Sequence, residues 1–340
     1  MDRNKRSRIY LIVLVIAIFI VYTYRQNQPR EVHLTGTTMG TIGYNVKYLD
    51  REERVFKQQV DSLLQDFNQS LSTYIPNSDI SVFNQQGQVQ FNFPYFYDVL
   101  LASSAVFEKT EGAFDPTVGP LIDAWGFGDG QMIGPNSMQV DSLLQYVGLN
   151  KITYDENGAQ ANLKGMKLNF SAIAKGQAID VVGNWLTNQG IENYMVEIGG
   201  EVRTKGLNLE NKLWTIAIET PDETAVGQIF DAVQLENQGM ASSGNYRNFR
   251  VINGKKVAHT IDPSSGYPKM QTLLSATILA PSCMLADAYA TACMVMGLEK
   301  SIRLVQSDDE LEAYLIFVND AGEIASFVSN GLKNRTLGRK

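Results

Sequence analysis

The sequence predicts an α+β fold, because segments with strand patterns and segments with helix patterns follow one another without strict alternation. Of its 340 residues, 44% are hydrophobic and 19% are charged, which is usual for a globular protein. There is no internal repeat and no low-complexity segment. A net charge of −7 and an isoelectric point near 5.0 argue against a nucleic-acid binder, since no basic stripe occurs beyond the extreme N-terminus.

The N-terminal segment has the pattern of a signal-anchor. An uncharged run, Ile9–Tyr24, follows four basic side chains: Arg3, Lys5, Arg6 and Arg8. The run is somewhat short for a membrane span, long for a signal-peptide core, and followed by no small-x-small cleavage site. We therefore expect residues 1–30 to be an uncleaved single-pass anchor and linker in the inner (cytoplasmic) membrane. The domain of residues 31–340 would lie on the periplasmic side. A cleaved signal peptide is the alternative and gives the same side.

The first half of the chain predicts one extended segment and two long helices. Val32–Tyr48 has strand character. Apolar residues recur near one helical face in two segments: Glu52–Leu71 and Pro94–Thr110. Turn-forming residues dominate two others, the second of which contains a helix-like turn: Thr73–Asn84 and Gly112–Gly134. A short helix is expected at Ser142–Val147.

The second half predicts more strands than helices. A short strand, Lys167–Phe170, precedes a helix, Ala174–Asn188. Further strands are expected at Tyr194–Val202, Leu213–Glu219, Gln234–Ser242, Arg250–Ile252 and Leu274–Leu279. Two helices should follow: Met284–Met296 and Glu299–Gln306. The last two strands, Ala313–Val318 and Glu323–Val328, indicate a terminal hairpin.

The two cysteines are expected to be buried and unpaired. Cys283 and Cys293 are ten residues apart, so on one helix they are separated by roughly 15 Å along its axis. That separation is too large for a disulfide. Small apolar surroundings suit a free buried cysteine.

The strongest chemical signal comes from two segments near the C-terminal end. Asp287 and Thr291 are four residues apart on a predicted helix, so their side chains share one face. A carboxylate and a hydroxyl suit a hard cation, most plausibly magnesium. His259, one of only two histidines, lies in a loop before Asp262 and could act as a base. A base beside a magnesium site suggests phosphate chemistry.

Other loops are rich in polar and glycine residues. The strand Lys167–Phe170 leads into a helix whose first turn contains Lys175, an arrangement that favours an anion such as phosphate. Three more segments offer contacts to a polar ligand: Thr35–Thr41, Ser72–Ser81 and Gly112–Pro120. Taken singly, each of these segments also fits an ordinary turn, a helix cap or a surface position.

Together these segments resemble, in their order and in their residues, the motifs of the ApbE family of FAD:protein FMN transferases. The resemblance extends from Thr35 to the C-terminus. It rests on five motifs: T-G-T-T-M-G-T at Thr35–Thr41, G-A-F-D-P-T-V-G-P at Gly112–Pro120, S-A-I-A-K-G at Ser171–Gly176, H-x-I-D-P-x-x-G-x-P at His259–Pro268, and A-D-A-x-A-T at Ala286–Thr291.

The resemblance implies a single T-fold-like α+β domain that transfers FMN from FAD to a serine or threonine of a partner protein and releases AMP. His259 would be the base. The magnesium ligands would be the Ala172 carbonyl, Asp287 and Thr291. The residues at the FAD-binding positions would be Met39, Tyr74, Ala113, Phe114, Asp115, Asn169, Lys175 and Ile261. The acceptor would belong to a membrane redox complex.

Two departures and two alternatives accompany this interpretation. Asn169 stands where the family usually has Asp, so the acceptor oxygen is kept and the charge is lost; Gln177 stands where an aromatic residue is common. The alternatives are a magnesium-dependent FAD hydrolase and a non-catalytic flavin carrier. Family acceptors resemble D-G-x-[ST]-G-A-[ST]. The only Asp-Gly pair here, Asp129-Gly130, lacks the acceptor hydroxyl, so we expect no self-modification.

Overall fold

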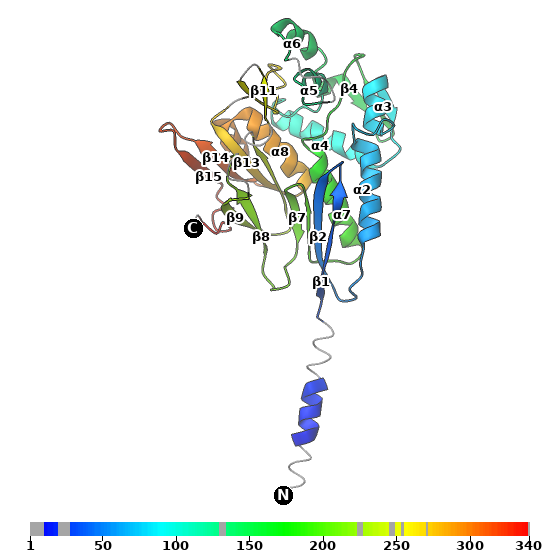
Figure 1. Ribbon diagram of the computed structural model, residues 1–340, viewed down its shortest axis with the longest axis vertical. Coiled ribbons are helices and arrows are strands. Elements are labelled where there is room, and N and C mark those ends of the chain that lie inside the picture. The colour runs from blue at the N-terminus through cyan, green and yellow to red at the C-terminus, as the bar shows by residue number, and fades with distance from the viewer. Residues whose placement is uncertain are drawn as a thin grey trace, which may run out of the picture.

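The fold is centred on one antiparallel sheet of eight strands (Figure 1). The computed structural model describes residues 10–19, 28–128, 134–222, 227–244, 249–252, 255–269 and 271–338. In spatial order the strands are β1 (Arg30–Thr38), β2 (Ile42–Asp50), β6 (Tyr194–Ile198), β7 (Glu201–Lys205), β10 (Gly239–Gly244), β13 (Leu273–Ala280), β14 (Glu312–Val318) and β15 (Ile324–Val328). The mixed α/β class predicted from the sequence is confirmed.

Helices cover one face of this sheet. They are α2 (Lys57–Leu71), α7 (Ala174–Asn188), α8 (Cys283–Met296) and α9 (Leu298–Gln306), with α4 (Tyr95–Lys109) packed on α2 and α8. Helix α8 is apolar nearly all round, and ten of its side chains are buried. This composition is typical of a helix enclosed on all sides. Both cysteines lie in α8, free and buried, as predicted.

The other face is covered in part by a two-stranded sheet of β8 (Trp214–Glu219) and β9 (Ile229–Leu235). Ile218 and Phe230 from this hairpin pack with Val202, Met240 and Leu279 of the main sheet. Smaller elements complete the fold: α3 (Asp79–Gln86), β3 (Gln88–Gln90), α5 (Gly119–Ala124), α6 (Ser137–Leu144), a 3₁₀ turn (Leu149–Lys151), β4 (Ile152–Tyr154), β5 (Gly158–Ala161), β11 (Phe249–Ile252) and β12 (Lys255–Ala258).

The main sheet has a seam between β7 and β10. These two strands pair at only two positions, Gly239 with Arg203 and Met240 with Val202. Beyond Met240 strand β10 continues beside β13 alone. The sheet therefore opens at the seam, which leaves room between the two strands.

Several predicted strands are hairpins. Val32–Tyr48 covers both β1 and β2, and Tyr194–Val202 covers β6 and the start of β7. The turn in the second hairpin is Gly199-Gly200, whose φ values of 62° and 104° favour glycine. Gln234–Ser242 also covers two strands, the end of β9 and most of β10, but these belong to different sheets. The predicted strand Lys167–Phe170 is absent, because Lys167 forms only one isolated bridge, to Val118.

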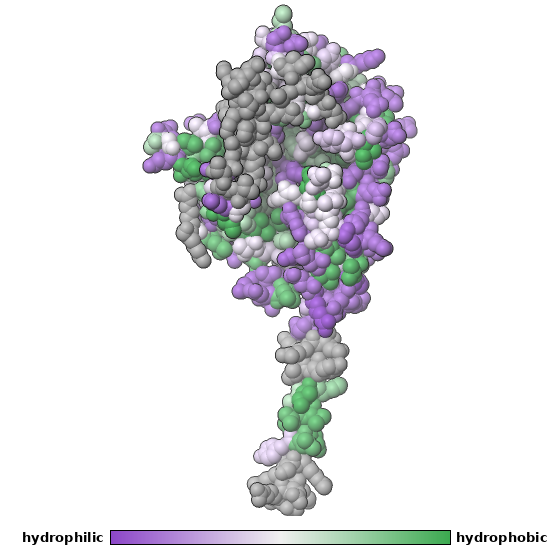
Figure 2. Space-filling model, viewed as in Figure 1, coloured by the Kyte–Doolittle hydropathy of each residue, from purple (hydrophilic) through white to green (hydrophobic). Residues whose placement is uncertain are grey.

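The described part of the predicted anchor is a helix of residues 10–19, whose side chains are exposed and largely apolar (Figure 2). Among the described residues no helix reaches the length and apolarity that a membrane crossing needs. The remainder of the apolar run, like Asp129-Gly130, lies outside the described residues.

Candidate functional site

A cavity of about 690 Å³ opens at the seam of the sheet. Its walls come from β7 and β10, from the first turn of α7, from α8, from strand β8, and from the loops around residues 113–116 and 259–263. Ten of the twelve candidate residues line it: Ala113, Phe114, Asp115, Asn169, Ala172, Lys175, His259, Ile261, Asp287 and Thr291. The structure thus brings together four of the five motifs.

Close packing of α7 against α8 sets the floor of the cavity. A Cβ atom on Gly176 would lie 2.2 Å from the Cys283 carbonyl oxygen, so only glycine permits this approach. Asp180 of α7 accepts hydrogen bonds from the backbone N–H groups of Cys283 and Met284, at 3.1 and 2.8 Å. A carboxylate at a helix N-terminus is stabilising. These contacts fix where α8 begins and so where Asp287 lies.

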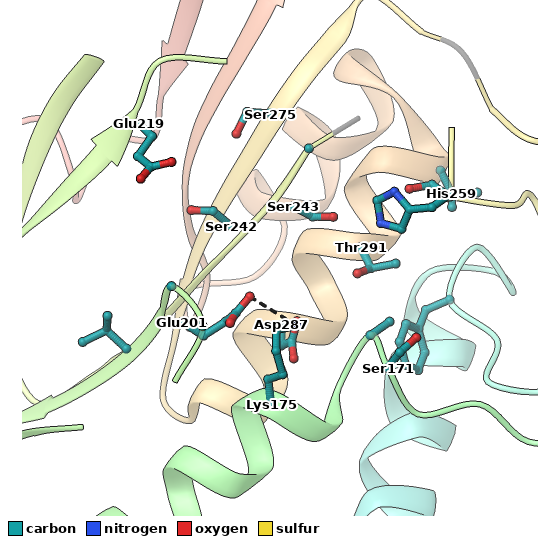
Figure 3. A pocket seen from close by; sticks show the side chains of 18 of the residues that line it. Ser171, Lys175, Glu201, Glu219, Ser242, Ser243, His259, Ser275, Asp287 and Thr291 are labelled. Atoms are coloured by element: carbon teal, nitrogen blue, oxygen red, sulfur yellow. Dashed lines mark ion pairs between the residues drawn. The ribbon is translucent and has the colours of Figure 1, made fainter. Parts of the chain in front are cut away.

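Three ionisable side chains, Lys175, Glu201 and Asp287, form a charged group at the centre of the cavity (Figure 3). Lys175 Nζ lies 3.3 Å from Glu201 Oε1 and 3.7 Å from Asp287 Oδ1. Asp287 Oδ2 also accepts a hydrogen bond from the Gly176 N–H at 3.1 Å. Glu201 Oε2 is buried and has no hydrogen-bond partner among the described residues. The group therefore has more acceptor oxygens than its own donors satisfy.

Burial and mutual attraction shift the pKa values of this group. Desolvation raises the pKa of Glu201 to about 8, against the attraction of Lys175. Desolvation also raises the pKa of Asp287, again opposed by Lys175. Burial alone would lower the pKa of Lys175, but Asp287 and Glu201 outweigh it and the pKa rises. Lys175 is therefore a fixed cation in the cavity.

Replacing Glu201 by Gln should make the protein less sensitive to alkaline pH. A carboxyl whose pKa is raised on folding contributes stability below its unfolded pKa, and this is lost as pH rises through about 8. Gln cannot ionise. We expect the thermal midpoint of the wild type to fall relative to Glu201→Gln between about pH 5 and about pH 9. Thermal unfolding of both proteins over this range tests it, and a constant difference would contradict it.

The candidate metal ligands come from two elements. Asp287 and Thr291 lie one turn apart on α8 and both line the cavity, and Ala172 precedes α7 on the facing wall. Within the described ranges, no group of three or more His, Cys, Asp and Glu side chains lies close enough to hold a metal. The oxygen set of one carboxylate, one hydroxyl and one carbonyl fits a hard cation such as magnesium and would leave ligand positions for substrate or water.

His259 lies across the cavity from the charged group (Figure 3). Its ring meets that of Phe127 edge-on, with centroids 6.5 Å apart. The following turn is rigid, because Asp262 accepts hydrogen bonds from Ser264 and from Lys269 Nζ at 2.9 Å. The imidazole is therefore held at the cavity wall by a well-bonded loop.

Two polar candidates have structural partners. Asp115 Oδ1 accepts from the backbone N–H and the hydroxyl of Thr117, at 2.8 and 2.6 Å. Burial raises the pKa of Asp115. Asn169 Oδ1 accepts from the Ser171 N–H at 2.9 Å, an Asx turn that leads the chain toward α7. An amide oxygen accepts this hydrogen bond as well as a carboxylate does. The local geometry is therefore kept although Asn169 stands where the family usually has Asp.

Two candidates do not line the cavity. Met39 lies in the β1–β2 turn with φ of 48°, in the left-handed region. Tyr74 lies in the loop after α2, with 77% of its surface exposed. Their assignment to FAD stays a prediction. The sequence analysis did not identify Glu201 as a site residue. Its position directly after Gly199-Gly200 was the one sequence signal that pointed to it.

Comparison with known proteins agrees with the sequence motifs. The model of the ApbE family matches residues 39–315. The chain is 39% identical over 326 residues to an FAD:protein FMN transferase of Haemophilus influenzae, covering 91% of this chain and 93% of the relative. It is 35% identical to the Vibrio cholerae enzyme of the same name, with 91% and 94% covered.

Solved structures agree as well. The flavin transferase ApbE from Vibrio cholerae superposes with a TM-score of 0.80 at 34% identity, covering 90% of this chain and 99% of that one. The apo flavinyl transferase ApbE of Pseudomonas stutzeri superposes with a TM-score of 0.78 at 30% identity, covering 89% and 96%. The likeness therefore extends over almost the whole length of each chain compared.

Proposed function

Since this chain belongs to the ApbE family and its activity is the transfer of FMN from FAD to a protein, we propose how its cavity performs that transfer. The acceptor is a serine or threonine hydroxyl. Its oxygen bonds to the FMN-side phosphorus, the bond from that phosphorus to the AMP oxygen breaks, and AMP leaves with the electron pair. The supporting observation is that one cavity holds a histidine opposite a lysine and two carboxylates.

His259 takes the proton of the incoming hydroxyl, because a serine or threonine hydroxyl is a weak nucleophile without a base. Lys175, held by Glu201 and Asp287, provides a fixed positive charge toward the pyrophosphate. Ile261 and the loop around Ala113 and Phe114 line the same cavity and would receive the rest of FAD.

Magnesium would be held by Asp287, Thr291 and the Ala172 carbonyl. The fit rests on the all-oxygen donor set and on the unsatisfied buried oxygen of Glu201 beside it. When bound, the ion would neutralise charge on the phosphates.

One incubation tests the activity. The purified protein is mixed with FAD, magnesium chloride and a synthetic peptide that carries the pattern D-G-x-[ST]-G-A-[ST], and the products are analysed by mass spectrometry. FMN joined to the peptide together with free AMP is the expected result. AMP and free FMN alone would mean an FAD hydrolase, and intact FAD would mean a flavin carrier.

The chain is proposed to remain tethered to the inner membrane with its domain on the periplasmic side, near an acceptor subunit of a membrane redox complex. The basic residues before the apolar run support this orientation, and the exposed apolar side chains of residues 10–19 support the tether. Protease added to intact spheroplasts should digest the domain, and the membrane fraction should retain an unprocessed N-terminus. Protection from protease would overturn the orientation, and a processed soluble chain would remove the anchor.

A further inference from the structure

Strand β8 has one edge without a partner strand in the part of the chain that the structure describes. It pairs with β9 alone. On its far side β9 is bonded to the C-terminal segment: Gln234 N–H donates to Arg335, and Ala232 accepts from Leu337 N–H, both at 2.9 Å. These two residues thus direct their backbone groups away from β8.

The pairing register then fixes which backbone groups of β8 face outward. In an antiparallel pair, hydrogen-bonded and non-bonded positions alternate. Gln234 and Ala232 lie opposite Thr215 and Ala217. Because those two β9 residues bond elsewhere, Thr215 and Ala217 direct their N–H and C=O groups to the free edge of β8, and Ile216 between them bonds to β9.

This free edge faces the cavity. Five consecutive residues, Thr215–Glu219, line it. Successive side chains of a strand lie on opposite faces, so a cavity bordered by a continuous run meets the strand at its edge. Trp214 and Ile218 are buried on one face, whereas Thr215 and Ala217 are exposed.

The middle of the edge also lacks the features that protect unused edges. Natural sheets usually guard a free edge with charged residues or proline, since unpaired N–H and C=O groups bind other strands. The stretch Thr215–Ile218, which contains the two outward-facing residues, has neither; the one charged residue of β8 is Glu219 at its end. The edge is therefore suited to accept an extended polypeptide.

The edge leads to the reacting centre. Glu219 lies on the same side of the cavity as Ser242 and Ser275, and His259 lies on the other side, above the charged group of Lys175, Glu201 and Asp287 (Figure 3). Residues of β8, β7 and β10 line one cavity at the seam between β7 and β10. A chain on β8 would thus border the cavity that holds Lys175, Asp287 and His259.

We propose that an extended segment of the acceptor polypeptide adds to β8 as a further strand and so delivers its hydroxyl to the centre of the cavity. This inference rests on the proposed function. Strand addition takes affinity from main-chain hydrogen bonds and specificity from alternate side chains. Recognition therefore depends on the acceptor backbone as well as on its sequence.

The first test uses the wild-type protein and a series of synthetic peptides with the pattern D-G-x-[ST]-G-A-[ST], each with one N-methylated backbone amide. Loss of a backbone hydrogen bond should lower kcat/KM roughly tenfold. The losses should occur at every second residue on one side of the acceptor hydroxyl. A scan without this two-residue period overturns the docking mode.

The second test uses Ala217→Pro, which removes one outward N–H donor. The expected result is a roughly tenfold higher KM for the peptide and an unchanged affinity for FAD, measured by flavin fluorescence. The matched control is Ser326→Pro. Asn319 N–H donates to Glu323, and Ser329 N–H to Ala313, so Ser326 of β15 faces outward at an edge away from the cavity.

The outcomes separate the two proposals. Equal KM values for the peptide with Ala217→Pro and Ser326→Pro would overturn docking on β8. If the unmodified peptide receives no FMN from the wild-type protein, the proposed function fails and this inference fails with it. If it receives FMN and the N-methyl scan is flat, the function stands and the docking mode is wrong.

Discussion

Replacing Asp287 by Ala should abolish magnesium-dependent turnover. Asp287 is the one charged side chain among the proposed ligands, and it lies on α8 opposite Lys175. Loss of the bound ion should remove several kcal/mol of transition-state stabilisation, or roughly 10³-fold in rate. Initial rates of peptide flavinylation across a magnesium titration measure the effect.

Asp287→Asn is the control for structural damage. The Asn oxygen can still accept the hydrogen bond from Gly176, which is 3.1 Å long in the wild type, but the charge is gone. It should fold like the wild type and need far more magnesium. Thr291→Val should have a smaller effect, since it removes a neutral ligand. Full activity of Asp287→Ala at ordinary magnesium levels would exclude the metal site.

Replacing His259 by Ala should leave FAD binding intact and lower the rate roughly 10²–10⁴-fold, the range for loss of a general base. The imidazole lines the cavity across from Lys175. Flavin fluorescence measures binding, and single-turnover transfer measures the chemical step.

The pH profile separates a base from a binding residue. If His259 is the base, the wild-type pH profile contains a step that the variant lacks. If FAD affinity collapses while bound FAD still reacts at the wild-type rate, His259 is a binding residue. Phe127→Leu is the matched control, because it removes the edge-on ring and keeps the imidazole.

Local patterns predicted three long helices well, but they missed α3 (Asp79–Gln86) inside a segment expected to form turns, and they placed α6 (Ser137–Leu144) at Ser142–Val147. The expected range Ala174–Asn188 is that of α7, and α4 and α8 differ from prediction by a residue or so at each end. Their apolar residues repeat at the helical period, which is visible within each segment. Strand boundaries were harder to predict, because one extended sequence pattern can contain a tight turn, as at Gly199-Gly200.

The charged centre could not be predicted in full. Asp287 and Thr291 were visible because they share one helix face. Glu201 meets Lys175 only because the β6–β7 hairpin returns beside α7. That proximity is tertiary and leaves no local pattern. The free edge of β8 could not be predicted either, since its outward-facing groups follow from the hydrogen bonds between the C-terminal segment and β9.

The seam between β7 and β10 divides the residues of the candidate site between two parts of the chain. Lys175 and Glu201 belong to the part that ends with β7, whereas His259, Asp287 and Thr291 belong to the part that begins with β10. Two residue pairs join the half-sheets, and the Asp180 contacts to α8 join their helices. Neither fragment of a chain cut between Lys205 and Trp214 contains both the cation and the base. Turnover by the recombined fragments would therefore report reassembly of the two half-sheets.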